Sequence, residues 1–265
     1  MPEAGISSDV TLWMFDFDGT LSPLVTERTA ASLDSACRDM LHRLAAVRGF
    51  HCAIISSRQL ADLETRVDVP GIFLGGGSGL EWKLPDGRRQ VPDVARMDAV
   101  RKIRKTVIPE IMAWGRLPGV DIEDKQWSVA IHFRRASEQA QHELATLLDR
   151  WQQTRKVRAF RGPAVVEIQL LPGVDKSFGV RAFCDLVTCT PAAVRLVYAG
   201  DDENDAVAMR LVRGWGGRII TVGEKAIVPG SDLVSSPVEL AQKIAILAGF
   251  RDSTEVETGT HRHGA

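Results

Sequence analysis

Several short apolar runs that end abruptly in small or polar residues constrain the fold of this chain most strongly. They are TLWMF before Asp16, CAII before Ser56, GIFL before Gly75, RLVYAG before Asp201, and RIITVG at 218–223. Runs that are apolar on both faces are typical of strands in a parallel sheet covered by helices. Helical patterns lie between them, at 29–48, 176–187 and 203–213. The alternation predicts an α/β fold with a doubly wound, parallel-sheet (Rossmann-like) core.

Residues 86–170 follow a different pattern, which predicts an inserted α+β domain of order αββαββ. A helical segment at about 93–116, which Pro109 would kink or split, and a second at about 137–153 each precede two alternating strands. The alternation places these polar residues on one face of the sheet: Glu123, Lys125, His132, Arg134 and Glu167. An ordinary solvated sheet face would show the same alternation, so the pattern alone leaves both interpretations open.

These patterns divide the chain into a core of residues 1–85 and 171–250 and a cap domain of residues 86–170. Two chain crossings connect the cap to the core, and such a connection is typical of a hinge. The polar segment 251–265 is rich in Gly and Thr, and we expect it to be disordered.

The composition excludes several classes of protein. With 265 residues, 45% of them hydrophobic, and a net charge of -1, the chain has a sizeable core and no basic field for nucleic acid or an anionic membrane. Its first residues lack a signal peptide's basic and apolar regions, so we expect a cytoplasmic protein. We also expect a monomer or weak homo-oligomer. We expect reduced core thiols at all four cysteines: Cys37, Cys52, Cys184 and Cys189.

The first apolar run ends against two carboxylates, in the stretch DFDGT at residues 16–20. Asp16 and Asp18 would repel each other at the end of one strand unless a positive charge lay between them, and a divalent cation is the simplest such charge. An Asp-Gly turn is the alternative, but it needs only one acid. Because ligands of such folds bind beyond the carboxyl ends of the strands, Asp16, Ser56 and Asp201 should converge there.

The ordered set of DFDGT, Ser56, Lys176 and GDDEND at 200–205 resembles the haloacid dehalogenase superfamily of phosphotransferases. The resemblance implies that Asp16 attacks phosphorus, that Asp18 is the acid and base, and that Thr20 belongs to the catalytic motif. It implies that Ser56 binds the phosphate and that Lys176 offsets its charge. It also implies a Mg²⁺ cofactor held by Asp16, the backbone carbonyl of Asp18 and Asp201, with support from Asp205; Asp202 and Asn204 are further candidates nearby.

The inserted domain resembles the type 2 cap of that superfamily, and the chain is most similar to the trehalose-6-phosphate phosphatases. The similarity rests on DFDGTLSPLV, IISSRQL, GSGLEW, VDIEDKQWSVAIHFR, VVEIQLLPGVDKS and GDDEND. It implies that a small sugar phosphate is the substrate and that Arg58 and the polar face of the cap bind it. The chain departs from the usual family motifs at Ser57, Ser78 and 204–206. Another sugar phosphate, a phosphomannomutase-like transfer and a non-catalytic sensor therefore stay open as alternatives.

Overall fold

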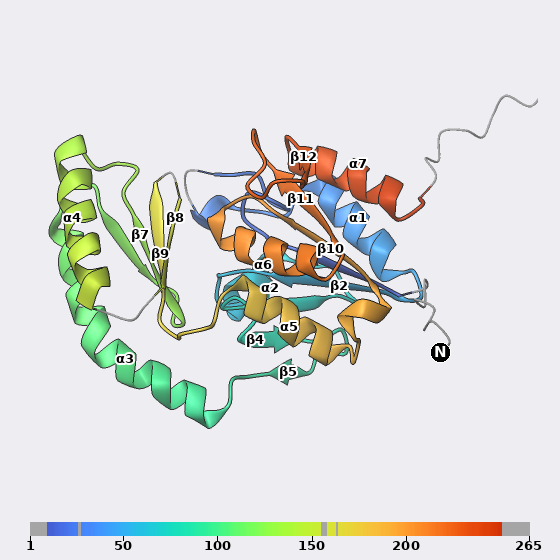
Figure 1. Cartoon of the computed structure of the whole chain (residues 1–265), viewed down its shortest axis with the longest axis horizontal. Helices are drawn as coiled ribbons and strands as arrows, with labels where there is room; N and C mark the ends of the chain where they lie inside the picture. The colour runs from blue at the N-terminus through green and yellow to red at the C-terminus, as the bar shows by residue number, and fades with distance from the viewer. Residues whose placement is uncertain (1–9, 26–27, 155–157, 163, 251–265) are drawn as a thin grey trace, which may run out of the picture.

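The computed structural model describes residues 10–25, 28–154, 158–162 and 164–250, which form two sheets with their covering helices (Figure 1). The larger sheet has the order β12-β11-β10-β1-β2-β3-β4-β5. Neighbouring strands from β12 to β3 are parallel, while β4 and β5 are antiparallel additions at one edge. The strands are β1 (Thr11–Phe15), β2 (Phe50–Ile55), β3 (Phe73–Gly76), β4 (Glu81–Lys83), β5 (Arg89–Gln90), β10 (Arg195–Gly200), β11 (Arg218–Val222) and β12 (Asp232–Val234).

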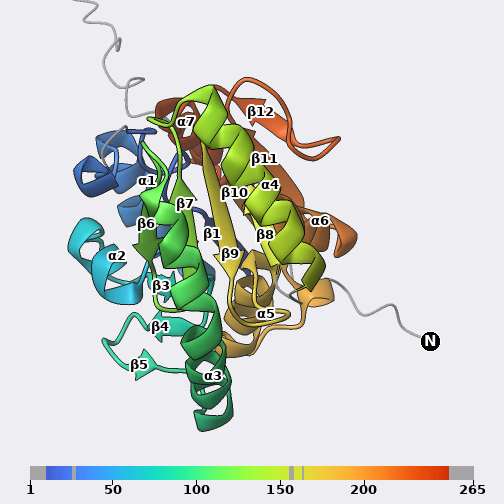
Figure 2. The same ribbon diagram turned by 90° about the vertical axis from the view of Figure 1, so that its left-hand side faces the viewer.

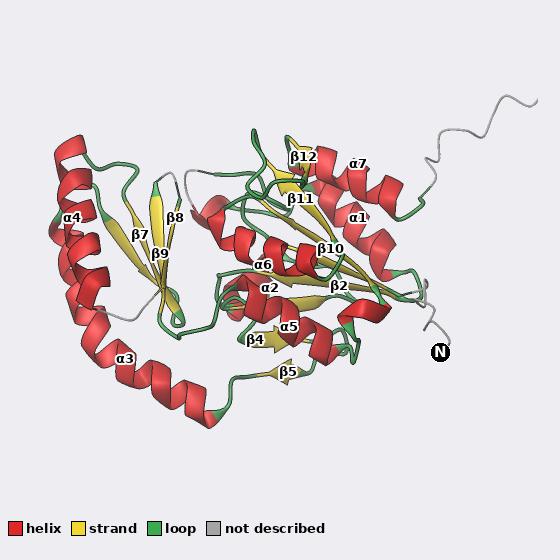
Figure 3. Ribbon diagram, in the orientation of Figure 1, coloured by secondary structure: helices red, strands yellow, loops and turns green. Residues whose placement is uncertain are grey.

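Strand β1 shows why the core strands are apolar on both faces. Trp13 and Phe15 pack into the cluster that includes α1 (Ser35–Ala45) and α7 (Pro237–Leu247). Leu12 and Met14 pack on the opposite face, in the cluster that includes α5 (Lys176–Leu186) and α6 (Glu203–Gly214). Figure 3 shows these helices on the two sides of the sheet. The predicted doubly wound α/β fold is therefore confirmed.

The remaining core elements are short. Helix α2 (Leu60–Arg66) packs beside β3, and two 3-10 turns are η1 (Arg28–Ala30) and η3 (Pro191–Ala193). The helix expected at 29–48 begins only at Ser35, because the Asp34 carboxylate caps it by accepting from the backbone N–H groups of Ala36 and Cys37.

The smaller sheet is antiparallel, with the order β6-β7-β9-β8. Its strands are β6 (Asp121–Asp124), β7 (Ser128–His132), β8 (Arg158–Arg161) and β9 (Val165–Gln169). Helices α3 (Val94–Met112) and α4 (Glu138–Thr154) cover one face, as Figures 1 and 2 show, and α3 ends in the 3-10 turn η2 (Ala113–Arg116). Helix α3 continues through Pro109, because the missing N–H affects only its last turn. The order αββαββ matches the expected cap.

The junction between the two sheets differs slightly from the expected boundary at residue 86. Strand β5 pairs with β4 in the core sheet, so the core continues to Gln90 before α3 begins. The segment 251–265, expected to be disordered, lies outside the described residues. Among the described residues, no helix is long and apolar enough to cross a membrane. All four cysteines are free thiols, three of them buried and Cys189 half-buried.

Candidate active site

Three neighbouring parallel strands end together and position the predicted catalytic groups. Asp16 follows β1, Ser56 follows β2 and Asp201 follows β10, and β1 lies between the other two in the sheet. Strands β2 and β10 flank β1 on opposite sides, so this is the point at which the strand order reverses. The structure therefore brings these three residues to one end of the sheet, as the sequence predicted.

Asp16 is almost completely buried, at 4% exposure, and lies against a buried lysine. The Lys176 Nζ donates a hydrogen bond to Asp16 Oδ1 at 2.6 Å, while the Thr20 hydroxyl lies 3.4 Å from Asp16 Oδ2. Burial raises the pKa of Asp16 to about 6 although Lys176 lowers it. Burial alone would lower the pKa of Lys176, but the Asp16 and Asp205 carboxylates raise it well above its usual value. Asp16 Oδ2 is thus the oxygen with the weaker protein contact.

Glycine at position 19 lets the β1 loop lie directly against Asp201. Its φ of 80° is in the left-handed region, and a Cβ atom there would lie 2.1 Å from Asp201 Oδ2. The tight turn is held by the Phe17 carbonyl, which accepts hydrogen bonds from the backbone N–H groups of Leu21 and Ser22. Only glycine therefore allows the Asp201 carboxylate to approach the loop that carries Asp16 and Asp18.

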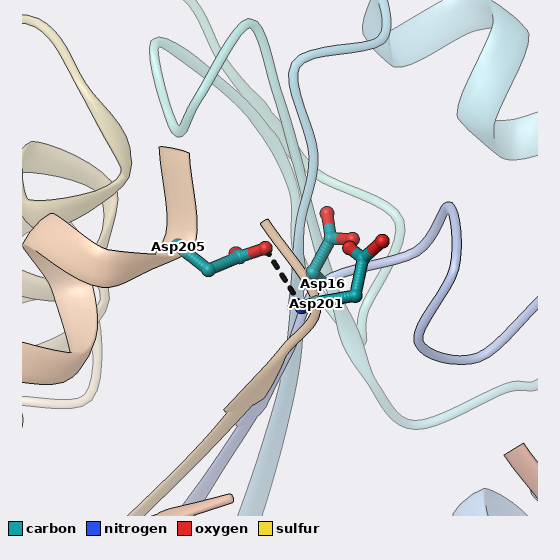
Figure 4. Close-up of side chains that lie close together, drawn as sticks. All are labelled: Asp16, Asp201 and Asp205. Atoms are coloured by element: carbon teal, nitrogen blue, oxygen red, sulfur yellow. Dashed lines mark hydrogen bonds between the residues drawn. The ribbon is translucent and has the colours of Figure 1, made fainter. Parts of the chain in front are cut away.

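Asp205 connects Lys176 to the loop after β10. Its Oδ1 accepts hydrogen bonds from Lys176 Nζ at 2.7 Å and from the Tyr198 hydroxyl at 2.7 Å. Its Oδ2 accepts from the backbone N–H groups of Asp201 at 3.1 Å and Asp202 at 3.3 Å. The bond to Asp201 is the dashed line in Figure 4. With four donors on its two oxygens, Asp205 orients Lys176 and the Asp201 loop.

The residues around Asp205 have local roles that the sequence did not reveal. Tyr198 lies on β10 and is fully buried, yet a single tyrosine on an apolar strand gives no signal of a contact with an acid. Asp202 caps α6, because its carboxylate accepts from the backbone N–H groups of Asn204 and Asp205. Asn204 is buried, at 3% exposure, in the first turn of that helix.

The carboxylates at this end of the sheet form a site whose donor atoms suit a hard divalent cation. One oxygen each of Asp16, Asp201 and Asp205 lies within 4.8 Å of the others, and Figure 4 shows the Asp16 and Asp201 carboxylates side by side. Burial, followed by the charge of Asp16, raises the pKa of Asp201 well above its usual value. Such crowding of acids is relieved by a bound cation, and an all-oxygen donor set is the kind that Mg²⁺ prefers.

The acidic cluster predicts a pH-dependent effect of Mg²⁺ on stability. The pKa of Asp16 is raised to about 6 and that of Asp202 to about 7, so the folded chain binds protons more tightly than the unfolded chain. The metal-free protein should therefore lose stability as the pH rises from about 4 to about 7. Added Mg²⁺ should raise the Tm more at about pH 7.5 than at about pH 5, where protons compete for the same oxygens.

Thermal melts with and without Mg²⁺ at the two pH values test this expectation. The Asp201→Asn variant should respond less to Mg²⁺, whereas Asp185→Asn, on the exposed side of α5, should respond like the unmodified chain. Equal Tm shifts at both pH values would contradict the assignment of the cluster as the metal site.

Both carboxylate oxygens of Asp18 are bound by a buried arginine. Arg58 Nε donates to Asp18 Oδ2 and Arg58 Nη2 to Asp18 Oδ1, both at 2.7 Å, and Nη1 reaches Asp62 at 2.5 Å. Burial would lower the pKa of the Arg58 guanidinium, but its hydrogen bonds to the carboxylates of Asp18 and Asp62 raise that pKa above its usual value. The Arg58 side chain is only 2% exposed. These contacts join Arg58 to carboxylates of the core. The Ser56 hydroxyl accepts a hydrogen bond from the backbone N–H of Arg58 at 3.2 Å.

The cap presents its polar face to the core, and most of the predicted residues share it. The row Glu123–Ala130–Glu167 runs directly across β6, β7 and β9, and His132 Nε2 lies 3.2 Å from Glu123 Oε2. Arg134 is not on this face of the sheet, because β7 ends at His132 and Arg134 lies exposed in the following turn.

A buried lysine links this face to the core. Lys125 Nζ donates to Glu167 Oε2 at 2.8 Å and to the Ser57 hydroxyl at 3.0 Å. The Ser128 hydroxyl donates to Glu167 Oε1 at 2.7 Å. Burial would raise the pKa of Glu167, but Lys125 and the hydroxyls lower it below its usual value. Ser57 and Ser128 were not among the predicted site residues; Ser128 lies on β7, on the same face of the sheet as His132.

Comparisons with known proteins agree with this geometry. A sequence model of the family described as trehalose-phosphatase matches residues 14–223. A trehalose-phosphate phosphatase of Mycobacterium tuberculosis is 34% identical over 203 residues, which cover 75% of this chain and 50% of the relative. The corresponding protein of Mycobacterium avium is 34% identical over 205 residues, covering 76% of this chain and 51% of the relative. The chain thus spans about half the length of the curated relatives it matches.

Solved structures are similar over nearly the whole chain. The C-terminal domain of the C. albicans trehalose-6-phosphate phosphatase superposes with a TM-score of 0.75 at 22% identity, covering 92% of this chain and 93% of that one. A protein described as related to trehalose-6-phosphate phosphatase gives a TM-score of 0.70 at 18% identity, covering 89% and 96%. At these identities the structures show that the fold is shared.

Proposed function

Because the chain belongs to the trehalose-phosphatase family, we propose that it hydrolyses phosphate monoesters of sugars, with trehalose 6-phosphate as the preferred substrate. The observation that carries the proposal is the buried Asp16–Lys176 pair at the end of β1, next to a second carboxylate at Asp201 and below the polar face of the cap. A nucleophilic carboxylate and a fixed positive charge are what transfer of a phosphoryl group from a monoester requires.

In the proposed mechanism Asp16 Oδ2 attacks phosphorus. The new oxygen–phosphorus bond gives an aspartyl phosphate, while the bond from phosphorus to the sugar oxygen breaks and Asp18 gives that oxygen a proton. Water then attacks the phosphorus of the aspartyl phosphate and gives a proton to Asp18, which frees phosphate and restores Asp16. Lys176 stays on Asp16 Oδ1 and offsets the charge between two anions, and the Ser56 hydroxyl donates to the phosphate.

We further propose that Mg²⁺ is held by Asp16, Asp201 and the backbone carbonyl of Asp18. When bound, the ion neutralises charge on the phosphate and on the attacking carboxylate. Asp205 orients the site, since both of its oxygens already accept hydrogen bonds. Arg58 fits a role in positioning Asp18 better than the direct substrate contact that the family resemblance implied, because its guanidinium is engaged with Asp18 and Asp62.

A panel of sugar phosphates assayed with Mg²⁺ tests the choice of substrate. Trehalose 6-phosphate should give the highest kcat/KM, and 4-nitrophenyl phosphate should be a weaker substrate that does not depend on the cap. Preference for another sugar phosphate would keep the reaction and change the substrate. Transfer of the phosphoryl group to a second sugar position, without release of phosphate, would support the phosphomannomutase-like alternative instead.

Substitution of Glu123 tests the contribution of the cap. Glu123→Ala should lower kcat/KM for trehalose 6-phosphate by roughly 10–100-fold, because a hydroxyl of the sugar loses a hydrogen bond to a charged group. Hydrolysis of 4-nitrophenyl phosphate, which is too small to reach β6, should stay near its original rate. Glu143→Ala, on α4 at the opposite side of the cap, is the matched control. Equal losses on both substrates would show that Glu123 supports the fold and does not bind the sugar.

A further inference from the structure

Gln169, the last residue of β9, carries a buried donor without a partner on the polar face of the cap. The side chain is 2% exposed, and within the described part of the chain its Nε2 atom has no hydrogen-bond acceptor. A buried amide in this condition costs free energy, because it has lost its water without gaining a protein partner. Such a group in a folded protein calls for a physical explanation.

The register of the sheet places Gln169 beside the predicted sugar-binding residues. It lies directly opposite Ser128 on β7 and opposite Arg158 on β8, and two residues along the same face from Glu167. It is also the last residue of the last cap strand, and the next element along the chain is α5, which begins at Lys176.

The neighbours of Gln169 are engaged elsewhere. Ser128 donates its hydroxyl proton to Glu167, and Arg158 Nη1 pairs with Asp175 at 2.5 Å. Asp175 in turn caps α5 by accepting from the backbone N–H of Ser177. Within the described residues, the side chains opposite Gln169 on both neighbouring strands therefore have partners, whereas the Gln169 Nε2 atom has none.

We propose that Gln169 is a further substrate-binding residue, whose amide N–H donates a hydrogen bond to a hydroxyl or ether oxygen of the sugar. This inference rests on the proposed function, because it assumes that the polar face of the cap binds the sugar part of a sugar phosphate. The unpartnered Nε2 atom is a hydrogen-bond donor, so the ligand atom that it binds must be an acceptor. Sugar oxygens are such acceptors. A phosphate oxygen is another, and the test below distinguishes the two. Gln169 thereby adds a specificity determinant to Glu123 and Glu167.

Gln169→Met keeps the length of the side chain and removes both polar atoms. For the sugar phosphate that the unmodified enzyme prefers, KM should rise roughly 5–20-fold, which corresponds to the loss of one neutral hydrogen bond and leaves kcat nearly unchanged. Inhibition by the free sugar product should weaken by the same factor, while KM for 4-nitrophenyl phosphate and inhibition by inorganic phosphate should stay constant. The Tm should rise by about 2–4 °C, because an unpartnered buried amide is removed.

Two further variants make the result decisive. Gln169→Glu keeps the shape of the side chain but replaces the amide donor by a carboxylate, which only accepts hydrogen bonds and adds a negative charge. It should therefore weaken sugar binding at least as much as Gln169→Met does, and unchanged sugar affinity in this variant would overturn the proposal. Gln153→Leu, at an exposed position of α4, is the control for a Gln substitution in the cap.

Two other outcomes would also overturn the proposal. A higher Tm with unchanged KM in Gln169→Met would show that the amide destabilises the fold and does not bind the sugar. Weakened inhibition by inorganic phosphate would assign it to the phosphate and also overturn the proposal. The activity of the unmodified chain on the panel of sugar phosphates tests the proposed function independently of the role of Gln169.

Discussion

Replacing Asp16 by asparagine should lower hydrolysis of every phosphate monoester by at least about 10³-fold, because the amide cannot attack phosphorus. The loss should be the same for trehalose 6-phosphate and 4-nitrophenyl phosphate, since both pass through the same nucleophile. The fold should persist: asparagine has the shape of aspartate, and its neutral amide relieves repulsion from Asp201, which burial and Asp16 together keep at a raised pKa.

Steady-state rates and a thermal melt of Asp16→Asn are the measurements that check this. Asp185→Asn, which removes one exposed carboxylate from α5, serves as the matched control and should keep full activity. A Tm within a few degrees of the unmodified chain, together with lost turnover, would support the nucleophilic role. Full activity of Asp16→Asn would contradict the mechanism.

Replacing Asp18 by asparagine should produce a loss that depends on the leaving group. A sugar alkoxide is a poor leaving group and needs a proton from Asp18, so hydrolysis of trehalose 6-phosphate should fall by roughly 10²–10⁴-fold. The 4-nitrophenolate anion leaves without protonation, and its ester should lose much less. In the structure both oxygens of Asp18 accept from Arg58, so proton transfer to the sugar requires at least one of them to leave the guanidinium.

The control for this variant is Asp62→Asn, which alters the other carboxylate on Arg58 and leaves Asp18 intact. It should affect both esters similarly and weakly. The measurement is the hydrolysis rate of each ester by each of the two variants, relative to the unmodified chain. Equal losses for both esters in Asp18→Asn would rule out the role of Asp18 as the acid.

The parts of the fold that the sequence predicted are those in which burial on both faces leaves a clear pattern. Strands β1 and β10 were predicted to the residue, because every one of their central side chains packs into one of two cores. Strands β4, β5 and β12 are only two or three residues long, which is too short for any period to emerge. The start of α1 was misplaced because its position is set by one capping carboxylate, Asp34.

In the candidate site, too, some features could be predicted from the sequence and others could not. Strand ends in a parallel sheet meet at one edge, so the convergence of Asp16, Ser56 and Asp201 followed from topology. The side-chain contacts within the site could not be predicted from topology. Nothing in the sequence pairs Arg58 with Asp18, which lie 40 residues apart, or Tyr198 with Asp205. Arg134 was placed on the cap face by alternation, but the strand ends two residues earlier, where the alternating pattern no longer applies.

The central claim is that Asp16 carries the phosphoryl group during turnover, and a rapid-quench experiment with radiolabelled sugar phosphate tests it most directly. Enzyme mixed with Mg²⁺ and labelled substrate would be quenched in acid during a single turnover and digested into peptides. The account predicts label on the peptide that contains Asp16, released by hydroxylamine as an acyl phosphate is, and absent from Asp16→Asn. Product formation without any labelled enzyme in the turnover interval, or label on a different residue that resists hydroxylamine, would contradict it.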